Sequence, residues 1–160
     1  MINKIFKPMI LLFCAVLLIS CSDNNKNNSL NITKEDEKII RAYLDNNTGN
    51  VIVNSEEETY SAFKVLGTGN NKIYLWVLKE NKSGSGASMP VLLNAKRDND
   101  FLKITSYKTP GDGDDYGKDI KKMFPKPVQN EIFSDVSKHN AMIEDLKKQL
   151  DEIKATKSTN

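Results

Sequence analysis

The sequence predicts an α+β fold made of an N-terminal helix, an antiparallel meander sheet of about four strands, and C-terminal helices. Residues 34–45 carry apolar side chains at helical spacing, residues 60–107 contain short apolar runs separated by turn residues, and residues 112–156 return to helical spacing. Strands that follow one another without intervening helices are typical of a meander. The helices then have to cover the faces of that sheet.

The N-terminal helix is predicted over about residues 34–45. Thr33 is expected to cap it, and three acidic residues fill the first turn, where the helix dipole favours negative charge. The polar run 46–49 is expected to end it. One face is apolar and consists of Ile39, Ile40, Tyr43 and Leu44.

The first two strands are predicted over residues 60–66 and 72–79, and the glycine- and asparagine-rich residues 67–71 between them favour a hairpin. The second strand is apolar at odd and at even positions, a pattern typical of a central strand that is covered on both faces. Its two faces carry Ile73, Leu75 and Val77 on one side, and Tyr74, Trp76 and Leu78 on the other.

Two more strands are predicted over residues 90–93 and 101–107. A glycine- and serine-rich loop over 81–88 precedes the first of them, and a polar turn over 97–100 separates the two. Successive hairpins of this kind indicate an antiparallel meander.

The C-terminal part predicts three helices. The first follows the turn over 109–115 and stops at Pro125, the second starts near Pro127, and the third covers about 138–156. The first helix is expected to place Tyr116, Ile120, Met123 and Phe124 at helical spacing. We expect an i,i+4 pair between Glu144 and Lys148 on the third helix. Its apolar seam is expected to pack on its own domain, with a dimeric coiled coil as the alternative; the seam consists of Ile143, Leu146, Leu150 and Ile153.

The N-terminus carries a targeting segment. Two lysines precede an apolar run over residues 9–19, which is too short to cross a hydrocarbon layer of roughly 30 Å as a permanent helix. The residues Leu18-Ile19-Ser20-Cys21 resemble the lipobox of bacterial lipoproteins. This resemblance implies a signal peptide over 1–20, cleavage between Ser20 and Cys21, and a diacylglycerol on the Cys21 sulfur. The alternative is an ordinary secreted protein whose signal ends near a cysteine.

The remaining chain is expected to form a polar, disordered tether over 21–32 and a single domain over 33–157. Removal of the signal peptide leaves 21 basic and 21 acidic residues. This balance gives no argument for nucleic acid binding or for an electrostatic membrane patch. Cys14 leaves with the signal and Cys21 is consumed by lipid, so disulfides, thiolate metal sites and cysteine nucleophiles are excluded from the domain.

Two polar features were considered as sites of chemistry. Asp112, Asp114 and Asp115 offer oxygen ligands for calcium, but a helix-loop-helix calcium loop needs a glutamate about twelve positions in, where Met123 stands. A tight turn and a helix cap explain the same aspartates without a metal. His139 has no evident partner and is interpreted as a solvated surface residue. We therefore expect no catalytic residue, no metal and no cofactor.

A binding surface is the remaining candidate site. Tyr74 and Trp76 share one face of the central strand, and the loop around Gly84 is placed to border them. The alternative, which we favour, is that helices cover this face and make both aromatic rings part of the core.

The domain itself also has a resemblance. IYLWVLKE, SGASMPVLL and TPGDGDDYGKDIKKMFP are similar to a poorly characterised lipoprotein domain of low-GC Gram-positive bacteria of the Bacillus type. The resemblance implies a lipid-anchored protein on the extracytoplasmic face of the cell membrane. We expect a non-enzymatic binding or accessory domain that meets an envelope protein or a small ligand. The alternatives are a hydrolase that uses carboxylates such as Asp112 and Asp115, and an inhibitory or immunity-type lipoprotein.

Overall fold

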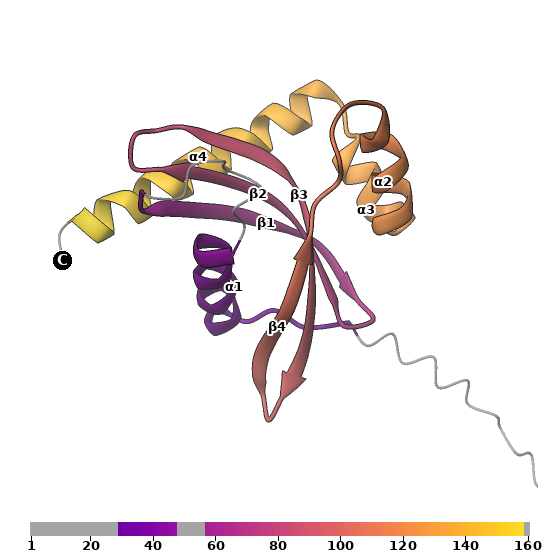
Figure 1. Cartoon of the computed structure of the whole chain (residues 1–160), viewed down its shortest axis with the longest axis horizontal. Helices are drawn as coiled ribbons and strands as arrows, with labels where there is room; N and C mark the ends of the chain where they lie inside the picture. The colour runs from indigo at the N-terminus through magenta and orange to yellow at the C-terminus, as the bar shows by residue number, and fades with distance from the viewer. Residues whose placement is uncertain (1–28, 48–56, 159–160) are drawn as a thin grey trace, which may run out of the picture.

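A computed structural model describes residues 29–47 and 57–158, and Figure 1 shows the arrangement of its elements. The four strands form one antiparallel sheet in the order β1-β2-β3-β4, so the predicted α+β meander is confirmed. The predictions for the signal peptide, for Ser20 and for Cys21 lie outside the described residues. The elements are α1 (Lys34–Asn47), β1 (Thr59–Gly69), β2 (Lys72–Asn81), β3 (Gly86–Asp98), β4 (Phe101–Lys108), a 3₁₀ turn (Gly113–Asp115), α2 (Tyr116–Met123), α3 (Lys126–Ile132) and α4 (Val136–Ser158).

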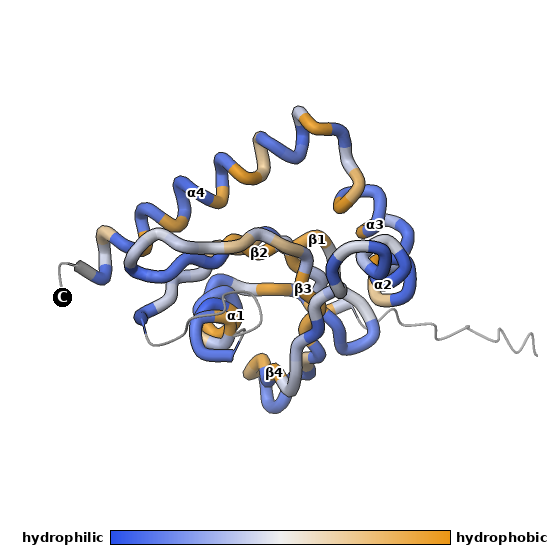
Figure 2. The backbone as a smooth tube through the Cα atoms, turned by 45° about the horizontal axis from the view of Figure 1, so that its top comes forward, coloured by the Kyte–Doolittle hydropathy of each residue, from blue (hydrophilic) through white to orange (hydrophobic). Residues whose placement is uncertain are grey.

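Helices cover both faces of the sheet. The helix α1 lies on one face, and α2, α3 and α4 lie on the other (Figure 1). Hydrophobic residues concentrate on the strands between these two layers (Figure 2). The buried residues form one cluster on each face, so the domain has two cores that share the sheet.

The central strand behaves as its sequence predicts. From Ile73 to Lys79 every residue of β2 is buried, because β1 and β3 flank the strand and helices cover both of its faces. Ile73, Leu75 and Val77 belong to the core under α1, and Tyr74, Trp76 and Leu78 belong to the core under the other helices.

Tight turns join the strands. Asn70 and Asn71 have φ angles of 50° and 60°, and Asn99 and Asp100 have 47° and 69°. Positive φ at both central residues is what a two-residue type I′ hairpin requires, and asparagine and aspartate tolerate it. The predicted loop over 81–88 is too long, because β3 already begins at Gly86.

The start of α1 is fixed as predicted. The backbone N–H of Asp36 donates to the Thr33 hydroxyl over 3.2 Å, and the Thr33 N–H donates back to the Asp36 carboxylate over 2.8 Å. This is a reciprocal capping box with aspartate at its third position. Arg97 of β3 adds an ion pair of 2.6 Å to the same carboxylate, which joins α1 to the β3–β4 hairpin. The arginine and the cap both lower the pKa of Asp36.

The domain starts earlier than the predicted tether allows. Leu30 and Ile32, which we placed in the tether, are half-buried and pack on the core under α1. Ser29 bonds to Thr68 beside the β1–β2 turn, with 2.9 Å between the hydroxyl oxygens. The tether prediction is therefore wrong for residues 29–32, because two apolar residues there find a place on the sheet.

The seam of α4 packs on the sheet of its own domain, since Leu146 and Leu150 are buried in the core that α4 shares with β1 and β2. Glu144 pairs with Lys147 at 3.0 Å, one position earlier than the predicted partner Lys148. Across residues 29–47 and 57–158, no helix has the length and apolar character needed to cross a membrane.

Candidate functional site

The aromatic surface predicted on β2 is not exposed. Tyr74 and Trp76 retain only 7% and 5% of their exposure, because α2, α3 and α4 cover them. Phe124 packs against Tyr74 with ring centroids 5.8 Å apart. The Trp76 indole donates to the Ser88 hydroxyl over 2.6 Å. The binding-surface prediction for these two residues is wrong, and the favoured alternative, ordinary core, is what the fold contains.

Gly84 forms a turn and, contrary to the prediction, does not border an exposed aromatic surface. It sits in the β2–β3 turn with φ +90°, a conformation that residues with a side chain rarely adopt. Asn81 closes this turn by accepting hydrogen bonds from the Ser85 N–H at 2.8 Å and from the Gly84 N–H at 3.1 Å. The glycine thus serves the backbone of a hairpin.

His139 is not a solvated residue without partners. It is half-buried, and its ring meets Trp76 edge to face with centroids 4.8 Å apart. The interpretation as a surface histidine is therefore wrong. The contact places the imidazole over the core under α4, where it helps to cover the indole.

The acidic turn lies open to solvent. Asp112, Asp114 and Asp115 are exposed, and neither Asp112 nor Asp115 caps its helix with its side chain, so the predicted capping role is not found. Asp115 pairs with Lys118 at 3.1 Å. Within the described parts of the chain, no three histidine, cysteine or acidic side chains gather closely enough to hold a metal ion.

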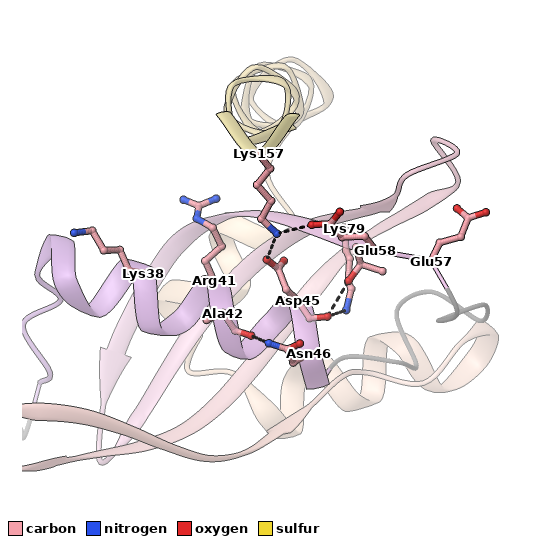
Figure 3. Close-up of a pocket in the computed structure, with 10 residues that line it drawn as sticks. Lys38, Arg41, Ala42, Asp45, Asn46, Glu57, Glu58, Lys79 and Lys157 are labelled. Atoms are coloured by element: carbon pink, nitrogen blue, oxygen red, sulfur yellow. Dashed lines mark hydrogen bonds and ion pairs between the residues drawn. The ribbon is translucent and has the colours of Figure 1, made fainter. Parts of the chain in front are cut away.

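A polar cleft at the C-terminal end of α1 is the candidate site that the fold creates. It has a volume of about 650 Å³ and lies between α1, the start of β1 and the end of α4 (Figure 3). Charged groups of both signs surround it. We call this cleft, with its described lining residues, the charged cleft; they are Lys38, Arg41, Ala42, Asp45, Asn46, Glu57, Glu58, Thr59, Lys79 and Lys157.

Lys79 forms the floor of the charged cleft. It continues the face of β2 that carries Ile73, Leu75 and Val77, so its stem is buried under α1. Its ammonium group donates to the carbonyl oxygens of Leu44 and Asp45 over 2.7 and 3.2 Å. These carbonyls belong to the last turns of α1, where the helix dipole favours a cation. Burial lowers the pKa of Lys79, and the charge of Asp45 partly opposes that shift.

Asp45 is the least satisfied group in the charged cleft. Its side chain is 12% exposed, and its Oδ1 atom is buried without a hydrogen-bond partner among the described residues. Burial raises the pKa of this carboxyl, and the Ser61 hydroxyl and the cations Lys157, Lys79 and Arg41 act in the opposite direction. The Ser61 hydroxyl oxygen makes no hydrogen bond to the Asp45 carboxylate, so its influence on the pKa of Asp45 comes from its proximity.

Lys157 joins the end of α4 to the charged cleft. Figure 3 shows its side chain pointing from α4 toward Asp45 and Glu58, and its ammonium nitrogen lies 3.7 Å from Asp45 and 3.2 Å from Glu58. It also lies 4.9 Å from the centre of the Tyr60 ring. The Tyr60 hydroxyl donates to Glu58 over 3.0 Å, and this bond, followed by the bond from Lys157, lowers the pKa of Glu58.

The sequence alone did not predict the four charged residues at the centre of the cleft. They are Asp45, Glu58, Lys79 and Lys157. One signal was present: Lys79 stands at a position where the alternation of β2 calls for an apolar side chain, and a lysine there has to find buried acceptors. Asp45 comes from α1, Glu58 from the residue before β1 and Lys157 from α4, and their meeting point depends on the tertiary fold.

No family model matches the chain, and the searches of curated proteins and of solved structures find no significant match to it. The chemistry of the cleft therefore has to be judged from its own residues. Groups with shifted pKa values that gather in a cleft are typical of functional sites, although structural ion-pair networks produce them too.

Proposed function

We propose that this chain is a lipid-anchored lipoprotein of the extracytoplasmic face, and that its domain binds a polar envelope partner in the charged cleft. The observation that carries the proposal is the position of the cleft relative to the point where the chain enters the domain. Ser29 joins the domain beside Thr68 at one end of β1, whereas Thr59 lines the cleft at the other end. At roughly 3.3 Å per residue, the eleven residues of β1 separate the two ends by about 33 Å.

The anchor part of the proposal depends on Leu18-Ile19-Ser20-Cys21. Two or three acyl chains on one cysteine give durable membrane attachment, whereas a single chain gives only marginal attachment. A chain held through Cys21 would have its domain tethered at the Ser29 end. The charged cleft would then face away from the lipid, where a partner can reach it.

The partner part depends on the chemistry of the cleft. Its lining carries four cationic and three acidic side chains, so it suits a polar, charged ligand or a protein segment with such side chains better than an apolar molecule. The Oδ1 atom of Asp45 is closed off from solvent, so the exposed charges of the rim are the groups that a partner would meet.

The anchor is tested by metabolic labelling with a radioactive fatty acid and by fractionation of the producing cells. Cys21→Ser should abolish the label and release the protein from the membrane fraction or leave its signal uncut. Cys14→Ser is the matched control, because Cys14 belongs to the segment that is removed, and this variant should keep the label. Label that persists in Cys21→Ser would refute the anchor.

The cleft is tested by photocrosslinking in intact cells. A photoreactive residue at position 38, on the rim of the cleft, should give a discrete adduct, and the same residue at position 148, exposed on α4, should not. Lys157→Glu should reduce the adduct at position 38, because it removes the cation that faces Asp45 and Glu58. Equal adducts at both positions would assign the contact to some other surface.

A second candidate is a carboxylate hydrolase at this same cleft, because Asp45 and Glu58 have pKa values shifted in opposite directions. Such a divergence is what an acid–base pair needs. The proposed binding role accounts better for the contacts, since Lys157 lies close to both carboxylates and Tyr60 donates to Glu58. Release of a product from envelope fractions by the wild-type chain, lost in Asp45→Asn, would favour the hydrolase.

The predicted hydrolase residues Asp112 and Asp115 do not support that candidate, because they lie exposed on a solvated turn and the lining of the charged cleft does not include them.

A further inference from the structure

The end of the domain at which the chain enters brings together segments that are far apart in sequence. Ser29, the β1–β2 turn and the α2–α3 connection line one hollow of about 430 Å³. Close packing fixes this arrangement: a Cβ atom on Gly67 would lie 3.1 Å from the Val128 side chain. Figure 1 shows the α2–α3 pair beside the β1–β2 turn. We call this region, formed by Ser29, residues 66–74 and residues 120–130, the basic end.

The basic end carries positive charge without acidic neighbours in its own segments. Residues 66–74 and 120–130 contain no aspartate or glutamate, and they contain Lys72, Lys121, Lys122 and Lys126. The flanking acidic residues Asp119 and Glu131 bind the Gly111 N–H and Lys138. Lys72 is half-exposed and the other three lysines of the basic end are exposed. None of these four lysines forms an ion pair with a residue that the structure describes, whereas the lysines Lys154 and Lys157 near the charged cleft do.

Apolar surface accompanies these lysines. Pro125 and Pro127 are exposed on either side of Lys126, and Leu66 is half-buried in the same hollow, whereas Tyr74 and Val128 form its buried base. Lysines around apolar surface are typical of a segment that meets a bilayer, where the charges contact anionic headgroups and the apolar groups contact the interface.

We infer that the basic end is a contact surface for an anionic lipid bilayer. The orientation rests on the proposed anchor at Cys21: residues 22–28 separate it from Ser29, and the eight steps from Cys21 to Ser29 span at most about 29 Å when fully extended. A chain that leaves the domain at the basic end holds this end nearest the lipid. The unpaired lysines then lie at the end of the domain that faces the headgroups, and they attract anionic lipid whenever the tether lets them come within the Debye length of about 8 Å.

Binding to vesicles tests the inference. The mature chain with Cys21→Ser is sedimented with vesicles of phosphatidylcholine, with or without 30% phosphatidylglycerol, at low and at high salt. We expect binding to the anionic vesicles only, and we expect added salt to weaken it. Lys122→Glu/Lys126→Glu should weaken it about tenfold or more, because each lysine near an anionic surface contributes about fivefold.

The matched control is Lys82→Glu/Lys148→Glu. Both of its lysines are exposed, neither forms an ion pair within the described residues, and the change in net charge is the same. This variant should keep at least half of the wild-type binding. If the two double variants lose vesicle binding equally, net charge alone explains the binding and the inference is overturned. Equal binding of the wild-type chain to both kinds of vesicle would also overturn it.

Two further outcomes separate the sources of negative charge and the two proposals. Soluble polyphosphate is added as a competitor for binding to the anionic vesicles. If it binds the protein as tightly as the vesicles do, the lysines recognise an anionic polymer and the bilayer assignment falls. The test uses unlipidated protein, so its result does not depend on Cys21. Loss of lipid labelling in cells would refute the anchor alone, and absence of anionic vesicle binding would refute this contact surface alone.

Discussion

The lysines at the two ends of the sheet differ in whether they have charged partners. At the charged cleft, Lys79 and Lys157 find acceptors on α1 and just before β1, and their charges are matched by Asp45 and Glu58. At the basic end, Lys122 and Lys126 remain exposed and without ion pairs among the described residues. The same side chain therefore holds elements together at one end and is left for an outside partner at the other. Net charge alone, which is near balance, hides this difference.

The largest effect should come from the buried lysine of the charged cleft. Lys79→Ala removes the donor that the Leu44 and Asp45 carbonyls share, and it deletes a buried stem. We expect the free energy of unfolding to fall by about 3 kcal/mol, measured by urea unfolding. Lys82→Ala, an exposed lysine in the next turn, should change it by less than about 0.5 kcal/mol. Similar values for both variants would mean that the contacts of Lys79 add little.

A substitution in the basic end should destabilise the domain through lost apolar packing, not through lost polar contacts. Val128 is buried where α3 approaches β1, so Val128→Ala should cost about 2 kcal/mol through lost burial and the cavity left behind. Because no titrating group is involved, the loss should be the same at pH 4 and pH 7. Asn130→Ala, an exposed neighbour, is the control and should be nearly neutral. A loss that varied with pH would break the contrast between the two ends.

The fold was largely predictable from the sequence because its signals are local. Thr33 and the acidic first turn give the start of α1, and the two-sided apolar pattern of β2 gives a central, doubly covered strand. Turn residues such as Asn70 and Asn99 give the hairpins. Strand length was less predictable: β3 runs from Gly86 to Asp98, although the sequence predicts a strand only over 90–93.

The sites were not predictable because they depend on tertiary neighbours. Lys72 and Lys126 are more than fifty positions apart, so no local charge run marks the basic end. Asp45 is on α1, Glu58 directly precedes β1 and Lys157 is on α4, so these residues meet only when α4 crosses the sheet. The aromatic pair Tyr74 and Trp76 was correctly assigned to one face, but only the positions of the helices decide whether that face is covered.

A smaller effect is expected for the carboxyl of the charged cleft. The pKa of Asp45 is raised in the folded state, so the folded chain holds this proton more tightly than the unfolded chain does. Asp45 therefore lowers stability as the pH rises from about 4 through its raised pKa, and the loss is complete above that value. Asp45→Asn should remove this decline, because the amide does not titrate.

The measurement for Asp45→Asn is urea unfolding at about pH 2, pH 4 and pH 7, so that it covers the range below the unfolded pKa of aspartate as well as the range above it. Asp36 has a lowered pKa and acts with the opposite sign, because its contribution is present above its unfolded pKa and is lost as the pH falls through its folded pKa. Asp36→Asn is therefore the control that should change the pH dependence in the other direction. An unchanged pH dependence in Asp45→Asn would mean that burial does not disfavour this carboxylate.

The smallest effect should come from Lys157, because its ion pairs lie at the surface. Its side chain is 42% exposed, and exposed pairs contribute between zero and about 1 kcal/mol. Lys157→Ala should lower the free energy of unfolding by about 0.5 kcal/mol at low salt, and 1 M salt should erase much of that difference. Lys147→Ala, which breaks an exposed pair within α4 alone, should cost less, because it joins no two elements. If Lys157→Ala costs as much as Lys79→Ala, the end of α4 is held by the charged cleft itself, and the cleft is then a structural joint rather than a surface kept open for a partner.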